Sequence, residues 1–73
     1  MPSTAIGKIS YDASTRRLFV DFVTNGRRYA YSGVPLDVYE SFRRAFSKGS
    51  FFNRHIRDAY DCELVYDPKH LSA

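Results

Sequence analysis

The chain of 73 residues has a single cysteine, no tryptophan, no long apolar run and no low-complexity segment. One cysteine, Cys62, excludes a disulfide within the chain and favours a reducing compartment, because secreted domains of this size normally carry an even set of cysteines. No segment approaches the roughly 20 apolar residues of a membrane span. The first ten residues also lack the basic and apolar regions of a secretory signal. We therefore expect a cytoplasmic protein with no membrane partner.

What the chain does have is six phenylalanines and six tyrosines, enough large apolar groups for one small core. No repeat or linker divides the sequence. We expect a single domain over residues 1–73, with its folded core at about 5–66 and a frayed tail at 67–73.

The dipeptide Asn25-Gly26 predicts a β-hairpin, because these residue types tolerate the two positive φ angles of a type I′ turn. A two-residue loop pairs Thr24 with Arg27, Phe22 with Tyr29, and Val20 with Tyr31. One face of this hairpin then carries Leu18, Val20, Phe22, Tyr29 and Tyr31. The other face is mixed and carries Arg17, Phe19, Asp21, Val23, Arg28, Ala30 and Ser32.

Residues 5–11 alternate in the same way and predict a strand that precedes this hairpin. A four-residue loop at 12–15 would set Ile9 across from Leu18 and would place Lys8 on the mixed face beside Phe19. Together these strands make a three-stranded antiparallel meander.

Two helices are predicted to follow Gly33. Pro35 and Asp37 suit a first helical turn, and the apolar residues after them recur at helical spacing. These residues are Val38, Phe42, Ala45 and Phe46. The second helix begins near Ser47 or Ser50, and its buried side is Phe52, Ile56, Ala59 and Tyr60.

Packing these helices on the apolar sheet face gives an α+β domain of two layers. Residues 62–66 are either a short fourth strand or tail packing. Cys62 is expected to be buried near Leu64.

Several short motifs resemble the KTSC domain when they are taken in order: Tyr29-Ala30-Tyr31, Val34-Pro35, Ser47-Lys48-Gly49, Phe52-Asn53 and Ile56-Arg57-Asp58. That module is named for its occurrence at the C-terminus of some lysyl-tRNA synthetases, and the resemblance runs from about Ile9 to Tyr60. Stand-alone bacterial members are similar to this chain in length. The resemblance implies a bacterial protein and a role in RNA binding, since the family includes fusions to a tRNA-charging enzyme.

Charge is distributed unevenly along the chain. Nine Lys or Arg residues lie between Arg16 and Arg57, whereas four acids face Lys69 alone from Asp58 onward. The run from Ser41 to Arg57 contains no acid. Its cations are Arg43, Arg44, Lys48, Arg54 and Arg57, and a shared patch of these would bind a polyanion. The alternative is that they are ordinary exterior residues paired with Glu40, Asp58 or Asp61.

Phe19 and Phe51 fall off the apolar stripes, which makes them the candidates for contact with a partner. Phe51 beside Lys48 and Arg54 would combine ring stacking with positive charge, the pattern of single-strand binding. Tyr29 and Tyr31 are instead predicted to face the helices.

The segment Ser47–Asn53 has two interpretations: an anion-binding helix start, or a plain connection in which a serine caps the second helix. Lys48-Gly49 lacks the spacing of a nucleotide-hydrolysing loop. His55 and Cys62 have no third group at a matching spacing, so we predict no catalytic site, no cofactor and no metal.

The sequence thus predicts a small monomeric, non-catalytic module that binds RNA or another polyanion through Arg43, Arg44, Lys48, Phe51, Arg54 and Arg57. The alternative is a protein-interaction module that docks through the mixed sheet face, with Lys8, Phe19 and Val23, or through a strand edge.

Overall fold

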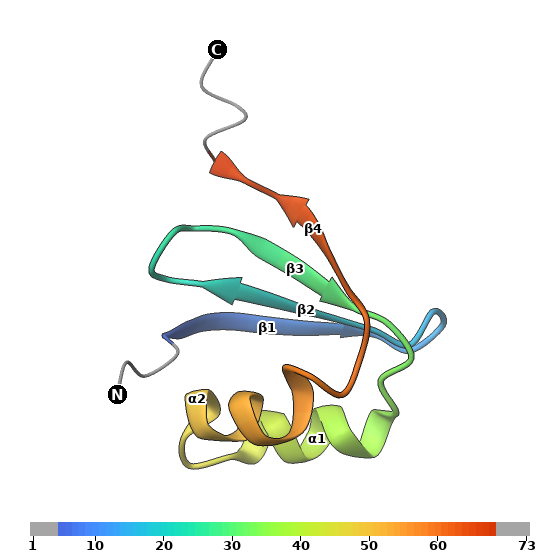
Figure 1. Cartoon of the computed structure of the whole chain (residues 1–73). Coiled ribbons are helices and arrows are strands. Elements are labelled where there is room, and N and C mark those ends of the chain that lie inside the picture. Colours follow the sequence, from blue (N-terminus) through green and yellow to red (C-terminus); the bar gives the residue numbers. More distant parts are fainter. Residues whose placement is uncertain (1–4, 69–73) are drawn as a thin grey trace.

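A four-stranded antiparallel sheet lies over a layer of helices, so one sheet face is covered and the other is open (Figure 1). The structure, a computed structural model, describes residues 5–68. The strands lie in the order β1 (Ile6–Asp12), β2 (Arg17–Phe22), β3 (Arg28–Tyr31) and β4 (Cys62–Tyr66). Between β3 and β4 the chain forms α1 (Leu36–Arg44), α2 (Lys48–Phe51) and the π-helical turn η1 (Phe52–Ile56). The predicted α+β class is confirmed, and residues 62–66 are the fourth strand.

The β1–β2 hairpin is shifted by two residues from the predicted pairing. Its four-residue loop is 13–16 rather than 12–15, so Ile9 faces Val20 and not Leu18. Asp12 stays in the strand, where its carboxylate accepts hydrogen bonds from the Ser14 amide at 3.0 Å and the Ser14 hydroxyl at 2.7 Å. Because side chains alternate along a strand, a two-residue shift leaves each of them on its predicted face.

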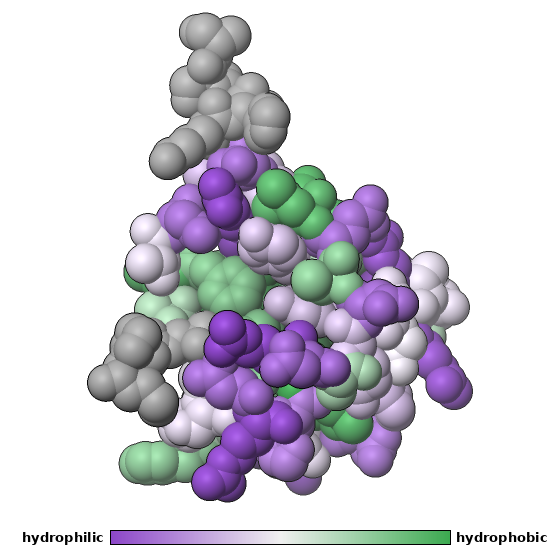
Figure 2. Space-filling model, in the orientation of Figure 1, coloured by the Kyte–Doolittle hydropathy of each residue, from purple (hydrophilic) through white to green (hydrophobic). Residues whose placement is uncertain are grey.

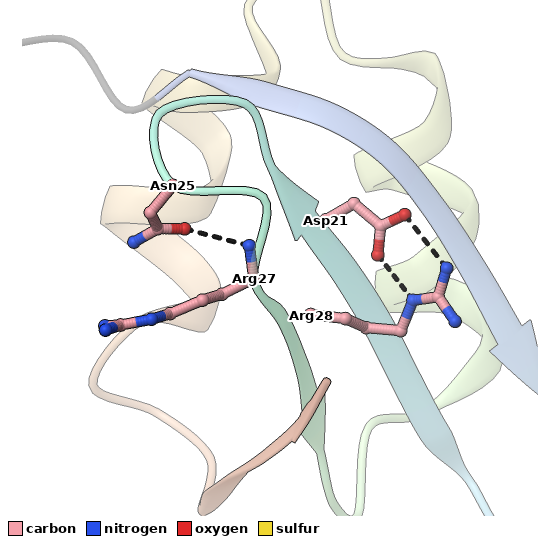
Figure 3. A network of polar contacts seen from close by, with 4 residues as sticks. All are labelled: Asp21, Asn25, Arg27 and Arg28. Atoms are coloured by element: carbon pink, nitrogen blue, oxygen red, sulfur yellow. Dashed lines mark hydrogen bonds and ion pairs between the residues drawn. The ribbon is translucent and has the colours of Figure 1, made fainter. Parts of the chain in front are cut away.

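The β2–β3 turn is not the predicted type I′ turn. Gly26 donates to the Phe22 carbonyl, and the Phe22 amide donates to the Arg27 carbonyl, both at 2.9 Å, which closes a four-residue loop at 23–26. Gly26 has a φ of 70°, whereas Asn25 does not adopt a positive φ. Asn25 acts through its side chain instead, accepting from the Arg27 amide at 3.0 Å (Figure 3).

The longer loop also moves the β2–β3 register by two residues. Val20 faces Tyr29, and Leu18 faces Tyr31, in place of the expected Phe22–Tyr29 and Val20–Tyr31 pairs. The set of residues that faces the helices is unchanged, and Leu18, Val20 and Tyr31 are all buried.

The core joins the covered sheet face to the helices. Its buried members are Leu18, Val20, Tyr31, Val34, Phe42, Phe52 and Ile56. At one end Tyr11 stacks on Tyr39, with ring centroids 4.9 Å apart, and its hydroxyl donates to the Val34 carbonyl at 2.6 Å. This contact ties β1 to α1 and to the segment that precedes α1.

Two residues predicted to lie on buried helical stripes are exposed. The Ser47 hydroxyl accepts from the Ser50 amide at 3.2 Å and caps α2, and a cap needs an extended backbone. Helix α1 ends at Arg44, since Ala45 already has an extended backbone, and Phe46 falls in the connection, where it is fully exposed. Ala59 is exposed as well, because the helix has already ended at Ile56.

The open sheet face is covered in part by its own side chains. Arg28 binds Asp21 at 2.6 and 3.2 Å across β2 and β3 (Figure 3), and Arg17 lies 3.3 Å from Glu63. The Arg17 guanidinium also sits over the Phe19 ring, 5.3 Å from its centroid. Phe19 is consequently half-buried.

Cys62, expected to be buried, is exposed on β4. It belongs to an edge strand all of whose residues are exposed, since the helices do not reach this far across the sheet (Figure 1). Of the predicted frayed tail, residues 69–73 lie outside the described part of the chain.

Candidate nucleic-acid interface

The turn between α1 and α2 brings three of the predicted cations to one end of the helical layer. Arg43 and Arg44 are the last residues of α1, and Lys48 is the first of α2. Only residues 45–47 separate the two helices, so Arg44 and Lys48 lie no more than about 15 Å apart by chain length. Arg43 and Arg44 are exposed, and Lys48 is half-buried.

The other two cations lie further along α2 and η1. Arg54 is exposed on η1, about 9 Å along the helix axis from Lys48. Arg57 follows η1 and is near enough to β3 for its charge to act on Tyr31. In Figure 2 hydrophilic side chains gather over the α2–η1 side of the helical layer. We refer to these five cations, which follow one another along the chain from the end of α1 to just after η1, as the cationic band.

Glu40 partly neutralises the α1 end of this band. Its carboxylate is 2.6 Å from Arg43 and 3.7 Å from Arg44. The hydrogen bond from Arg43 lowers the pKa of Glu40 and raises the pKa of Arg43. Exposed pairs of this kind contribute little to stability, so phosphates can compete for both arginines.

The remaining cations have no such partner. Within residues 5–68, Lys48, Arg54 and Arg57 form no ion pair, and the pairing with Asp58 or Asp61 that the alternative interpretation allowed is not present there. Three positive charges of the band are therefore available to a ligand.

Phe46 is an exposed aromatic ring at this site that was not predicted from the sequence. Its relative exposure is 107%, so its ring has no cover from the described residues. An apolar projection is visible in Figure 2 at the edge where Figure 1 places the α1–α2 turn. The candidate cap at Ser47 was a signal that the connection between the helices lies close to Phe46, because a capping residue is not part of the preceding helix.

Phe51, the ring singled out from the sequence, lies inside a stack. It is half-buried, with Phe42 at 5.4 Å and nearly parallel and with His55 at 4.6 Å and tilted by 46°. The stack runs from the fully buried Phe42 to the exposed His55. The outermost ring that a partner can reach is therefore His55.

A cleft of about 300 Å³ lies between α1 and the α2–η1 segment. Its lining is Asp37, Val38, Ser41, Phe51, His55 and Tyr60. Asp37, Ser41 and His55 are exposed, so the cleft opens at the surface. Nothing in the sequence pattern pointed to it, because its walls come from residues 23 positions apart that only the fold brings together.

Comparison with known proteins decides the family. The family model of the KTSC domain matches residues 2–60. The chain belongs to the KTSC domain family. A KTSC domain protein from Yersinia pestis, whose crystal structure is solved, is 35% identical and superposes with a TM-score of 0.81. The match covers 90% of this chain and 92% of that one. No protein with a curated description matches.

The resemblance stated from the ordered motifs is thus confirmed for this KTSC domain. Among residues 5–68 no group of three His, Cys, Asp or Glu side chains is placed to hold a metal ion. The His55 ring contacts Phe51 at a tilt of 46°, whereas Cys62 lies on the edge strand. In the same residues no helix is long and apolar enough to span a bilayer.

Proposed function

We propose that this KTSC domain is a non-catalytic module that binds single-stranded RNA at the α1–α2 turn and along η1. The observation that carries the proposal is the position of Phe46, fully exposed between Arg44 and Lys48. A ring left exposed by the described residues, flanked by cations on both sides in the chain, matches the needs of an unpaired base and its phosphates.

The two parts of the site do different work. Arg43, Arg44, Lys48, Arg54 and Arg57 attract phosphates, and each phosphate that is neutralised releases counterions. Phe46 offers a π-face on which a base stacks, and such stacking contributes about 1–3 kcal/mol per base. Stacking needs an unpaired base, which favours a single strand over a duplex.

The affinity for a fluorescent single-stranded RNA, measured by anisotropy at salt concentrations from about 50 to about 200 mM, tests the proposal. Lys48→Glu and Arg54→Glu should each weaken binding severalfold. Each should also reduce the slope of log affinity against log salt by about 0.7 or more, because a phosphate contact is lost.

Lys8→Glu is the matched control. Lys8 is exposed on β1, outside the helical layer, and its reversal changes the net charge by the same amount. It should leave both the affinity and the salt slope nearly unchanged. The proposal fails if no RNA binds at the lowest salt, or if Lys8→Glu weakens binding as much as Lys48→Glu does.

A second candidate function, capture of an extended protein segment, is favoured by the edge strand β4. Leu64 and Val65 are 40% and 41% exposed, and among the strands of residues 5–68 β4 pairs only with β3. A partner strand can add to such an edge. The open sheet face is less suitable, because Arg17 covers Phe19 and pairs with Glu63. Loss of a co-purifying protein on Val65→Lys, with no effect of Arg54→Glu, would favour this function over RNA binding.

A further inference from the structure

The cleft between α1 and η1 has walls of two chemical kinds. Three of its six lining residues are aromatic: Phe51, His55 and Tyr60. The α1 side contributes a carboxylate from Asp37 and a hydroxyl from Ser41. Among residues 5–68, Asp37 takes part in no ion pair, so its oxygens are available as acceptors.

We propose that this cleft holds one nucleobase and prefers guanine. The inference rests on the proposed RNA binding and deepens it, since it assigns a base-selective position beside the phosphate-binding band.

The size of the cleft and its rings favour a small aromatic ligand. A volume of about 300 Å³ is at the lower end of the range for small-molecule sites, and it admits a single base rather than a folded ligand. The ring of His55 rests on Phe51, which rests in turn on the buried Phe42, so the platform at the cleft is held by the core. A base placed on His55 would extend this stack by one ring.

The carboxylate of Asp37 selects among the bases. Guanine has an N1–H and an N2 amino group side by side, and both can donate to the two oxygens of one carboxylate. Adenine and cytosine each offer one amino group to Asp37. Uracil offers a single N–H between two carbonyl oxygens, which a carboxylate repels.

The surrounding charge argues against a small cation as the occupant, although an aromatic cleft with a carboxylate is suited to one. Residues 36–60 carry five Lys or Arg and three Asp or Glu. Their net positive charge repels a free cation and attracts the phosphate that a nucleotide carries. A nucleotide meets both requirements. Its neutral base can donate hydrogen bonds inside the cleft, and its phosphate is attracted by the surrounding cations.

The test uses uridine-rich RNA strands that differ only in one central nucleotide. With guanosine there, binding should be about tenfold tighter than with uridine. Inosine, which lacks the N2 amino group, should lose most of this gain. In Asp37→Asn the preference for guanosine over inosine should fall to about twofold or less, because an amide presents one acceptor in place of two.

Asp58→Asn is the control. Asp58 is exposed and does not line the cleft, and its substitution removes the same negative charge. Both variants should bind all strands slightly more tightly by charge alone, so the ratio between strands is the quantity that reports on the cleft. Equal binding of the three strands by the wild type overturns the inference, as does an unchanged ratio in Asp37→Asn.

Guanosine monophosphate, titrated alone and followed by the amide NMR signals of residues 37, 41 and 55, separates the two proposals. If every RNA strand fails to bind but these signals shift, the cleft is a site for a free nucleotide, and the proposed RNA binding fails. If RNA binds without base preference and the signals stay fixed, RNA binding stands and the guanine inference is overturned.

Discussion

The ring of Phe51 lies nearly parallel to that of Phe42, with centroids 5.4 Å apart and 11° between the ring planes. Phe42 is fully buried in α1, and Phe51 is the last residue of α2. This contact holds together the two helices whose facing ends carry Arg43, Arg44 and Lys48. The geometry of the cationic band therefore depends on an aromatic pair beneath it.

Replacing Phe51 by Ala should lower the free energy of unfolding by about 2 kcal/mol, less than the 3–5 kcal/mol typical of a fully buried Phe. The ring is half-buried, and its loss also removes the support of His55. Urea unfolding followed by circular dichroism measures the change. Phe46→Ala is the control for loss of a ring as such, and it should stay within about 0.5 kcal/mol of the wild type. Equal losses in the two variants would contradict this packing.

Phe46→Ala should instead weaken binding of single-stranded RNA by about 1–3 kcal/mol, which is the worth of one stacked base. Phe46→Trp should retain or tighten binding, because the larger ring still stacks. Anisotropy titrations at one fixed salt concentration measure both variants. An Ala variant that binds as tightly as the wild type would show that the exposed ring takes no part.

Glu40→Gln should strengthen RNA binding about twofold to fivefold and make its salt dependence steeper. The substitution releases Arg43 and Arg44, which now share the Glu40 carboxylate, so that two more cations meet phosphates. The same titration series measures the effect. Asp58→Asn removes an acid that pairs with neither arginine in the described residues, and it should give a smaller gain. Equal gains in the two variants would mean that only the net charge matters.

Because of Tyr31, the free energy of unfolding should decrease at alkaline pH. Burial raises the pKa of its hydroxyl above the ordinary value of 10.0, so the folded chain keeps a proton that the unfolded chain loses. The resulting stabilisation is fully present below about pH 10 and is lost as the pH rises above it. The stability of the wild type should then fall more steeply than that of Tyr31→Phe, by up to about 1.4 kcal/mol per pH unit. Urea unfolding of both proteins at about pH 8 and about pH 11 measures this, and parallel slopes would contradict it.

Much of the fold followed from local sequence signals, although the turns were not predicted in detail. The residues that face the helices were identified correctly because alternation along a strand survives a shift of two positions. The registers themselves were wrong, since the side chains of Asp12 and Asn25 shape a shifted β1–β2 loop and a longer β2–β3 loop than the sequence pattern suggested. Hydrogen bonds of this kind depend on the conformation that they stabilise, so the residue type alone does not reveal them.

The unpaired cations of the candidate site could be predicted from the sequence, but the exposure of its aromatic rings could not. Lys48, Arg54 and Arg57 form no ion pair within the described residues, as an acid-free run suggests. Phe46 was predicted to be buried and is exposed, whereas Phe51 was predicted to contact a partner and is half-buried. Helical spacing had assigned Phe46 to a helix that ends two residues earlier. The position at which α1 ends is determined by the connection to α2. The spacing of apolar residues in the two helices does not reveal it.

The sequence by itself determined the two-layer class, the face of the sheet that is buried, and the excess of cations between Ser41 and Arg57, because each of these follows from periodicity or composition. Tertiary structure alone decided that Phe46 is exposed while Phe51 is stacked, and that Asp37 and His55 line one cleft. These outcomes depend on where α1 stops and how closely η1 packs beside it, and both are set by contacts between residues distant in the chain.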